Sequence, residues 1–198
     1  MVFAARKLAT AEDLLALDDS VAAEVLAGEI VHKAAPSGAH SMAQSALGFQ
    51  LGGPFHRRGG GGAPGGWWLL SECDVELAAH DVVRPDWAGW RRSRVPEPPR
   101  ERPVRAVPDW ICEVISPSNA RTDLKLKLGL YQQHRVGHYW IVDPERETLT
   151  VHRWSDAGYL VSMVAARGEV VRAEPFEAIE LRVGLLFGDD PDDPPTGS

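Results

Sequence analysis

The pattern of apolar and polar positions near the start of the chain predicts a short helix followed by a strand hairpin. Thr10 and Asp13 have the spacing of a capping box, so a helix is expected over residues 11–17. Farther along, residues 22–35 carry apolar side chains on both sides of an Ala-Gly dipeptide at residues 27–28. Such a dipeptide favours a turn, and we expect two short strands joined there.

A longer helix is predicted after this hairpin. Ser37 or Ser41 can cap its start, and the Gly-Gly-Pro run at residues 52–54 is expected to end it. Residues 59–66 are almost all glycine, which gives them no side chains to pack and predicts a flexible surface loop. The apolar positions of the helix recur at mixed three- and four-residue spacing: Met42, Ala46, Phe49 and Leu51.

The middle of the chain alternates between strand patterns and a connector. Residues 67–79 and 82–90 are predicted to be paired strands with a turn between them, and residues 93–107 form a connector rich in proline and arginine. Two cysteines, Cys73 and Cys112, fall inside apolar strand patterns, where a thiol behaves as a small hydrophobic group. No CxxC pair is present, so the sequence carries no zinc or redox signal.

A strand, a helix and a second strand follow. Residues 109–115 are almost continuously apolar, which is typical of a central strand buried on both faces. Residues 120–134 have a helical pattern, residues 138–142 are again a strand, and residues 148–181 resemble a meander of short strands. We therefore predict an α/β (α+β) fold with a central mixed β-sheet flanked by helices and a C-terminal antiparallel β-meander.

Composition limits the class of protein. A chain of 198 residues with 44% hydrophobic and 25% charged residues suits one globular domain, which we assign to residues 1–187. Residues 188–198 are acidic and rich in proline, and we expect them to be a disordered tail. No apolar run is long enough to span a membrane, which predicts a cytoplasmic protein. The formal net charge of -7 argues mildly against avid DNA binding.

Two acidic residues stand in apolar strand surroundings. Asp86 follows Arg84-Pro85, and Glu113 lies in the middle of the predicted central strand. A buried carboxylate is costly unless it meets a cation, so two acids on adjacent strands suggest a shared divalent ion, with Mg or Mn suited to their hard oxygen ligands. The alternative is that Asp86 closes a turn after Pro85 and that Glu113 points to solvent from an edge strand.

The following helix carries a lysine that could assist this centre. Asp123, Lys127 and Tyr131 are spaced four residues apart and share one helical stripe. Spacing alone favours an ordinary helical ion pair. The functional alternative is that Lys127 positions or helps to deprotonate an attacking water and steadies the developing phosphate charge.

The segment PDWICEVISPSNARTDLKLKLGLYQQHRVGHYWIVDP at residues 108–144 resembles the signature of the Uma family of restriction-endonuclease-like proteins, a branch of the PD-(D/E)XK nuclease superfamily. Residues 23–30, AEVLAGEI, are similar to the opening pattern of that family, and His40 and the Arg-Pro-Asp at residues 84–86 follow. Ala23 and Ala27 depart from the opening pattern, which weakens the case for Glu24 as a further acidic participant. Water-exposed carboxylates at Glu24 and Glu29, and at Glu72 and Glu76, are the plainer interpretation.

The resemblance implies a restriction-endonuclease-like core in which Asp86 and Glu113 bind Mg or Mn. It also implies that the lysine comes from the following helix, because Ile115 stands where the superfamily would place it. Lys127 is the residue that fits, and Lys125 is the second choice. The implied activity is metal-dependent hydrolysis of DNA phosphodiesters by an endonuclease, and a homodimer is plausible. Four further residues are possible auxiliary members of the site: Glu24, Lys125, Asp123 and Tyr131.

Several alternatives remain open from the sequence. Arginines cluster after Asp86 and could contact phosphate, or they could belong to a solvated loop. His40 could touch phosphate or be a surface histidine. A nuclease-fold interaction module with exposed tryptophans such as Trp87 and Trp90 is the second hypothesis, and a small-molecule hydrolase is a weaker third. The predicted nucleic-acid contacts are Arg84, Arg91, Arg92, Arg94 and His40.

Overall fold

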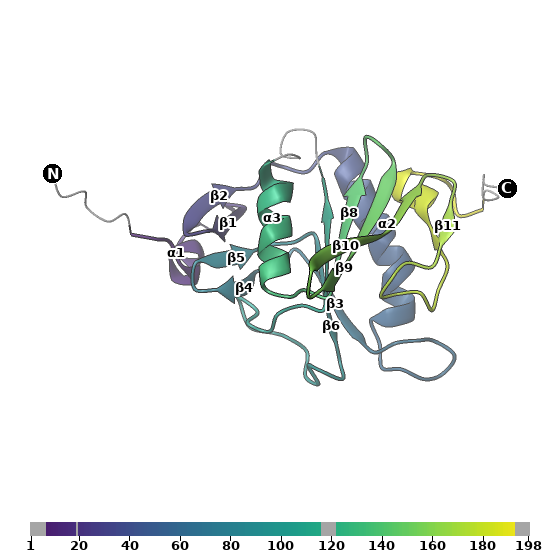
Figure 1. The fold of residues 1–198 in the computed structure, drawn as a ribbon, viewed down its shortest axis with the longest axis horizontal. Coiled ribbons are helices and arrows are strands. Elements are labelled where there is room, and N and C mark those ends of the chain that lie inside the picture. The colour runs from purple at the N-terminus through teal and green to yellow at the C-terminus, as the bar shows by residue number, and fades with distance from the viewer. Residues whose placement is uncertain (1–6, 19, 116–121, 193–198) are drawn as a thin grey trace.

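A computed structural model describes residues 7–18, 20–115 and 122–192, without the side chains of residues 122–124. Within these residues the chain forms two main sheets, a short two-stranded sheet and three α-helices (Figure 1). No helix in the described part is long and apolar enough to cross a membrane. The helices are α1 (Ala11–Leu15), α2 (Gly38–Phe55) and α3 (Thr122–Gln133).

The larger sheet has six strands and is mixed. Its central strands β7 and β8 run parallel and are joined through α3, whereas the other neighbours are antiparallel. The predicted strand-helix-strand unit and mixed sheet are therefore confirmed. In sheet order the strands are β10 (Gly158–Ala166), β9 (Thr148–Ser155), β8 (His138–Asp143), β7 (Trp110–Val114), β6 (Trp87–Arg91) and β3 (Trp67–Ser71).

The smaller sheet contains the predicted hairpin. Its order is β2-β1-β5-β4, and Ala27 and Gly28 form the turn between its first two strands with φ of 50° and 76°. Both angles lie in the left-handed region that a tight hairpin turn requires. The predicted capping box of α1 is present, and α1 packs on this sheet. The strands are β1 (Ala23–Leu26), β2 (Glu29–His32), β4 (Val75–Ala78) and β5 (Asp81–Val83).

The single long hairpin predicted over residues 67–90 is wrong. Each of its arms is broken, so that β3 pairs with β6 in the larger sheet while β4 pairs with β5 in the smaller one. Glu72 interrupts the first arm with φ of 50°, and Pro85, which lacks an amide hydrogen, interrupts the second. Cys73 lies in the first break and is half-buried, not inside a strand as predicted.

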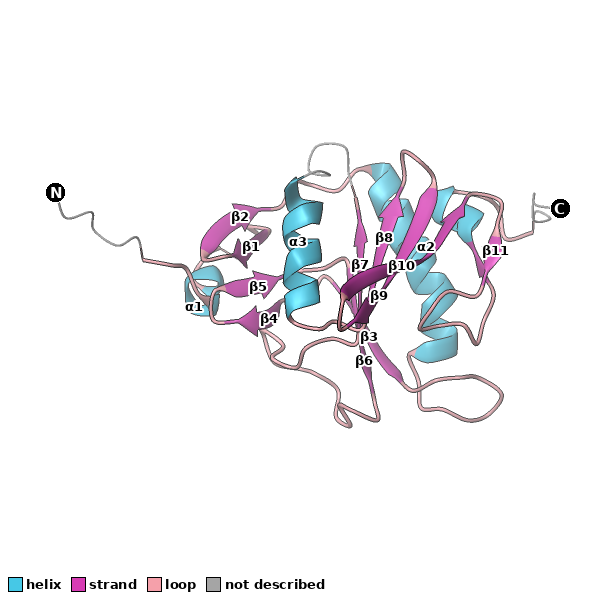
Figure 2. Cartoon of the chain, viewed as in Figure 1, coloured by secondary structure: helices cyan, strands magenta, loops and turns pink. Residues whose placement is uncertain are grey.

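Helices cover both faces of the larger sheet (Figure 2). Successive residues of a strand face opposite sides, and β7 uses both sides for the core. Its residues Trp110, Cys112 and Val114 pack with the buried face of α2, whereas Ile111 lies on the side of α3. Glu113 follows the same alternation and faces α3.

Helix α2 differs from its prediction in its end and its apolar face. It continues through residues 52–54 to Phe55, whose ring lies 4.7 Å from that of Phe176 in the core. Pro54 sits in the last turn, where its missing amide costs one hydrogen bond while the burial of Phe55 stabilises the turn. Of the residues predicted to face the sheet, Met42 and Phe49 are exposed. The buried face consists of His40, Ala43, Leu47, Leu51 and Phe55.

The C-terminal meander extends the larger sheet only through β9 and β10. The later strands β11 (Val170–Val171) and β12 (Leu181–Arg182) form the separate two-stranded sheet, and a 3-10 helix over Val183–Phe187 follows. Arg167 forms an ion pair of 2.6 Å with Asp189, so ordered contacts reach beyond residue 187. Residues 193–198 of the predicted disordered tail lie outside the described residues, and the domain boundary stays a prediction.

Candidate active site

Asp86 lies where the two sheets meet, immediately before β6. Its side chain is only 2% exposed. Oδ2 accepts a hydrogen bond of 2.6 Å from the Val114 amide at the end of β7. In the register of β6 and β7, Trp87 faces Cys112, and one further step places Asp86 opposite Glu113. The two predicted carboxylates therefore lie side by side, Glu113 in β7 and Asp86 just before the neighbouring β6, and the alternative in which Asp86 merely closes a turn is wrong.

Glu113 points into the interface between the larger sheet and α3. Its Oε1 accepts a hydrogen bond of 3.0 Å from Lys127 Nζ and one of 2.6 Å from the Tyr131 hydroxyl. Lys127 and Tyr131 are one turn apart on α3, so both reach the same strand residue. All three side chains are buried, which excludes the solvent-exposed position considered for Glu113.

Glu24 joins this group from the first strand of the smaller sheet. Its Oε1 lies 2.9 Å from Lys127 Nζ and accepts a hydrogen bond of 2.7 Å from the Arg84 amide. The residue is 3% exposed, so the expectation of a water-exposed hairpin carboxylate is wrong. A carboxylate is stable at this depth because a buried ammonium and a backbone amide replace its water.

Three further polar residues surround Asp86; the sequence indicated His40 as a possible phosphate contact, and it did not indicate Lys33 or Glu72 as part of this centre. Lys33 Nζ lies 3.5 Å from Asp86 Oδ1 and 3.3 Å from Glu72 Oε2, and it donates to the Arg84 carbonyl at 2.7 Å. His40 Nε2 lies 3.3 Å from Asp86 Oδ1. His40 is thus largely buried against an acid rather than a surface histidine. Glu72, expected to be a solvated carboxylate, is partly exposed at the rim of the same cluster.

Burial and the neighbouring charges shift the pKa values of the acidic and basic side chains of the site. Burial raises the pKa of the Glu113 carboxyl to about 7, although the Lys127 ammonium acts in the opposite direction. Burial alone would lower the pKa of Lys127, but Glu113 and Glu24 together outweigh it and hold that pKa above its ordinary value. Burial likewise opposes ionisation of Asp86, yet His40 and Lys33 bring its pKa below the usual range. Asp86 in turn raises the pKa of His40.

The raised pKa of Lys127 limits the role that this lysine can have. A lysine with a raised pKa keeps its proton at neutral pH and cannot accept one from water. The structure thus agrees with Lys127 as a cation that positions other groups and argues against Lys127 as a general base. The second choice, Lys125, is exposed on the same helix, and the side chain of Asp123 lies outside the described residues.

The predicted phosphate-binding arginines have partners within the protein. Arg84 makes a bidentate contact with the buried carboxylate of Asp74 at 2.6 and 3.1 Å, and its assignment as a nucleic-acid contact stays a prediction. At the end of β6 that is remote from Asp86, Arg91 and Arg92 lie over the rings of two tryptophans of β3. Arg94 is paired with an aspartate. Five residues of extended chain, about 17 Å, separate Asp86 from Arg91.

The tryptophans proposed as an exposed interface are also placed differently. Trp90 is fully buried, and its indole donates to the Ala106 carbonyl at 2.7 Å. Trp87 is half-buried, and its indole donates to the Gln44 carbonyl at 3.0 Å. The ring of Trp90 is therefore not available as an exposed anchor for a partner, and that of Trp87 is only partly exposed.

Comparisons with known proteins give the family and the fold of the chain. Residues 11–184 match the family described as "Uma2: Putative restriction endonuclease". The fold is similar to the crystal structure of a putative nuclease belonging to DUF820 from Anabaena variabilis, with a TM-score of 0.66 and 21% identity. The alignment covers 90% of this chain and 97% of that one. No curated protein sequence matches the chain. The predicted family resemblance and the restriction-endonuclease-like fold are confirmed.

Proposed function

The chain belongs to the Uma2 family, and from that premise we propose that it is a metal-dependent nuclease that hydrolyses DNA phosphodiester bonds at Asp86 and Glu113. The observation that carries the proposal is the convergence of Glu113 from β7 and Asp86, just before β6, with the buried Lys127. The same convergence of acids and cation is what hydrolysis of a phosphodiester requires.

The residues present fit a divalent ion. Asp86 Oδ1 is buried and has no hydrogen-bond partner of good geometry among the described residues, although two cationic groups flank it. Both donors to Glu113 contact Oε1, so the other oxygen, Oε2, would bind the ion. Mg or Mn suits these hard oxygen ligands. When bound, such an ion lowers the pKa of water and offsets the charge of the scissile phosphate.

The side chains on α3 then act on Glu113 and on the substrate. Lys127 and Tyr131 fix the orientation of the Glu113 carboxylate through one shared oxygen. Lys127 also adds a permanent positive charge beside the two acids, where it stabilises negative charge that develops on phosphate. Glu24 also pairs with the ammonium at 2.9 Å and so limits the directions in which it can donate.

The test is cleavage of supercoiled plasmid and single-stranded DNA with Mg²⁺ or Mn²⁺. We expect activity in the wild type, a loss of at least about a hundredfold in Glu113→Gln and Lys127→Ala, and little change in Lys125→Ala. Lys125→Ala is the matched control because it removes an exposed lysine from the same helix. Folded wild-type protein that cuts neither substrate with either ion would overturn the proposal in favour of a nuclease-fold interaction module.

The proposal extends to the substrate, the location and the assembly of the protein. We propose an endonuclease that uses DNA as its substrate, acts in the cytoplasm and assembles as a homodimer. The basic groups at Arg91, Arg92 and Arg94 support DNA contacts remote from the cleavage point, since their guanidinium groups lie toward the far end of β6. Light scattering of the purified protein would test the dimer separately from activity.

A further inference from the structure

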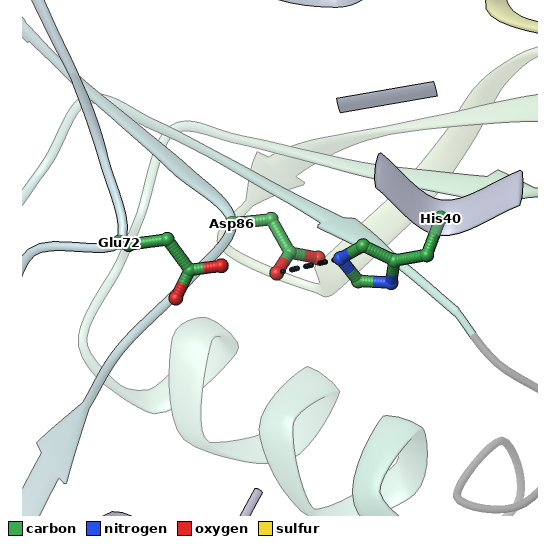
Figure 3. A group of neighbouring side chains, drawn as sticks. All are labelled: His40, Glu72 and Asp86. Carbon is green, nitrogen blue, oxygen red and sulfur yellow. Dashed lines mark ion pairs between the residues drawn. The ribbon is translucent and has the colours of Figure 1, made fainter. Parts of the chain in front are cut away.

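A second group of possible metal ligands shares Asp86 with the proposed catalytic pair. His40, Glu72 and Asp86 each offer one ligand atom, and these atoms lie within 4.8 Å of one another. Figure 3 shows the Asp86 carboxylate between the imidazole from α2 and the carboxylate that follows β3. Within the described part of the chain, a search for three or more neighbouring histidine, cysteine or acidic side chains that could hold an ion gives this group.

The orientation of these ligands is set by contacts outside the group. The Glu72 amide bonds to the Asp86 carbonyl at 3.4 Å, which ties the two chain breaks together. Gln44 donates to the Glu72 carboxylate at 3.3 Å and to the Asp86 carbonyl at 3.2 Å. The Ser37 side chain accepts from the His40 amide and begins the helix that carries the imidazole. The ligand positions therefore exist before any ion binds.

The Asp86 oxygen that fits the catalytic ion also points to a ligand at this place. Asp86 Oδ1 faces His40 and Lys33 from a side chain that is 2% exposed, yet it makes no hydrogen bond within the described part of the chain. A buried oxygen without a hydrogen bond is costly, and a bound cation would satisfy it.

We propose that His40, Glu72 and Asp86 form a site for a divalent transition-metal ion such as Mn²⁺, and that the Lys33 ammonium neutralises this site while no ion is bound. The inference extends the proposed function, with which it shares Asp86. An imidazole ligand distinguishes the site from the carboxylate pair, because nitrogen favours Mn²⁺ and later transition metals over Mg²⁺.

Lys33 is placed to compete with the ion. Its ammonium lies 3.3 Å from Glu72 and 3.5 Å from Asp86, which are two of the three ligands. A lysine side chain carries a positive charge at neutral pH, so the competitor is a cation. Its side chain is 21% exposed and can turn toward solvent when an ion binds. Removal of this charge should strengthen metal binding.

The experiment measures Mn²⁺ binding without DNA, by the electron paramagnetic resonance signal of free Mn²⁺. We expect His40→Ala and Glu72→Gln to raise the Kd on the order of tenfold or more, and Lys33→Met to lower it. Glu76→Gln is the matched control, since it removes a nearby strand carboxylate that pairs with Arg105. Mg²⁺ should displace Mn²⁺ only at much higher concentration.

Two results would overturn the inference. One is an unchanged Mn²⁺ affinity in Glu72→Gln, whose partly exposed side chain can be replaced with little risk to folding. The other is binding that is lost in Glu113→Gln but retained in His40→Ala. Failure of the proposed nuclease function is a separate outcome, in which Mn²⁺ binds with the expected dependence on His40 and Glu72 but no DNA is cut.

Discussion

Lys127 Nζ lies 3.0 Å from Glu113 Oε1, although the two residues are fourteen positions apart and belong to different elements. Both side chains are more than nine-tenths buried. The same ammonium also contacts Glu24, so one lysine pairs with two acids at the junction of the sheets and α3.

Replacement of Lys127 by methionine is expected to destabilise the fold. The change leaves Glu24 and Glu113 buried without their shared cation, and breaking a buried ion pair in this way costs about 3–5 kcal/mol. Urea unfolding would measure the loss. Lys125→Met, on the exposed face of the same helix, should change the free energy of unfolding by no more than about 0.5 kcal/mol. Equal effects of the two replacements would contradict the buried pair.

Stability should depend on pH through Glu113. Its pKa is about 7 in the folded protein against a reference value of 4.5, so the folded state binds more protons between these values. The contribution of Glu113 is therefore most favourable at low pH, and the free energy of unfolding falls by up to about 3 kcal/mol as pH rises through this window.

The measurement is urea unfolding from pH 4 to pH 8, with EDTA to exclude metal ions, of the wild type and Glu113→Gln. The glutamine cannot ionise, so the difference between the two curves isolates the titration of this residue. Curves that remain parallel over the whole range would show that the Glu113 pKa is not raised.

Packing between α2 and the region of Asp86 predicts opposite effects at two glycines. A Cβ on Gly48 would lie 2.5 Å from the ring of Trp87, so Gly48→Ala is expected to destabilise by about 1–3 kcal/mol. Gly52 lies one turn later with no atom within 4 Å of such a Cβ. Gly52→Ala should stabilise by about 0.5–1 kcal/mol through helix propensity alone. Thermal unfolding of both variants checks the contrast, and a stable Gly48→Ala would place Trp87 elsewhere.

The thiols should be unreactive in the folded protein. Burial raises the pKa of the Cys73 thiol to about 12, against a reference of 9.0, and burial also raises that of Cys112. At pH 8 the thiolate fraction of Cys73 is then about a thousandfold lower than for a free thiol. A disulfide reagent such as dithionitrobenzoate should label both cysteines only after denaturation. Rapid labelling of one thiol in the native protein would contradict the burial of Cys73.

Local sequence patterns determined much of the fold. The capping box before α1, the turn at residues 27–28, and the unit of β7, α3 and β8 depend on contacts between neighbours in the chain, and these were predicted in place. The family resemblance also placed Asp86, Glu113 and Lys127 in one centre. The strand-helix-strand unit, by contrast, needed only the order of elements, which sequence periodicity expresses directly.

Tertiary structure alone decided which other charged residues belong to the site. Lys33 and Glu72 are 39 residues apart, and Glu24 meets the Arg84 amide across 60 residues. No local pattern records such contacts. The breaks at Glu72 and Pro85 divide each arm between the two sheets. Asp86 lies at such a break, where His40 and Lys33 are its neighbours. Burial of a charge depends on the neighbours that replace its water, and those neighbours exist only once the two sheets have packed together.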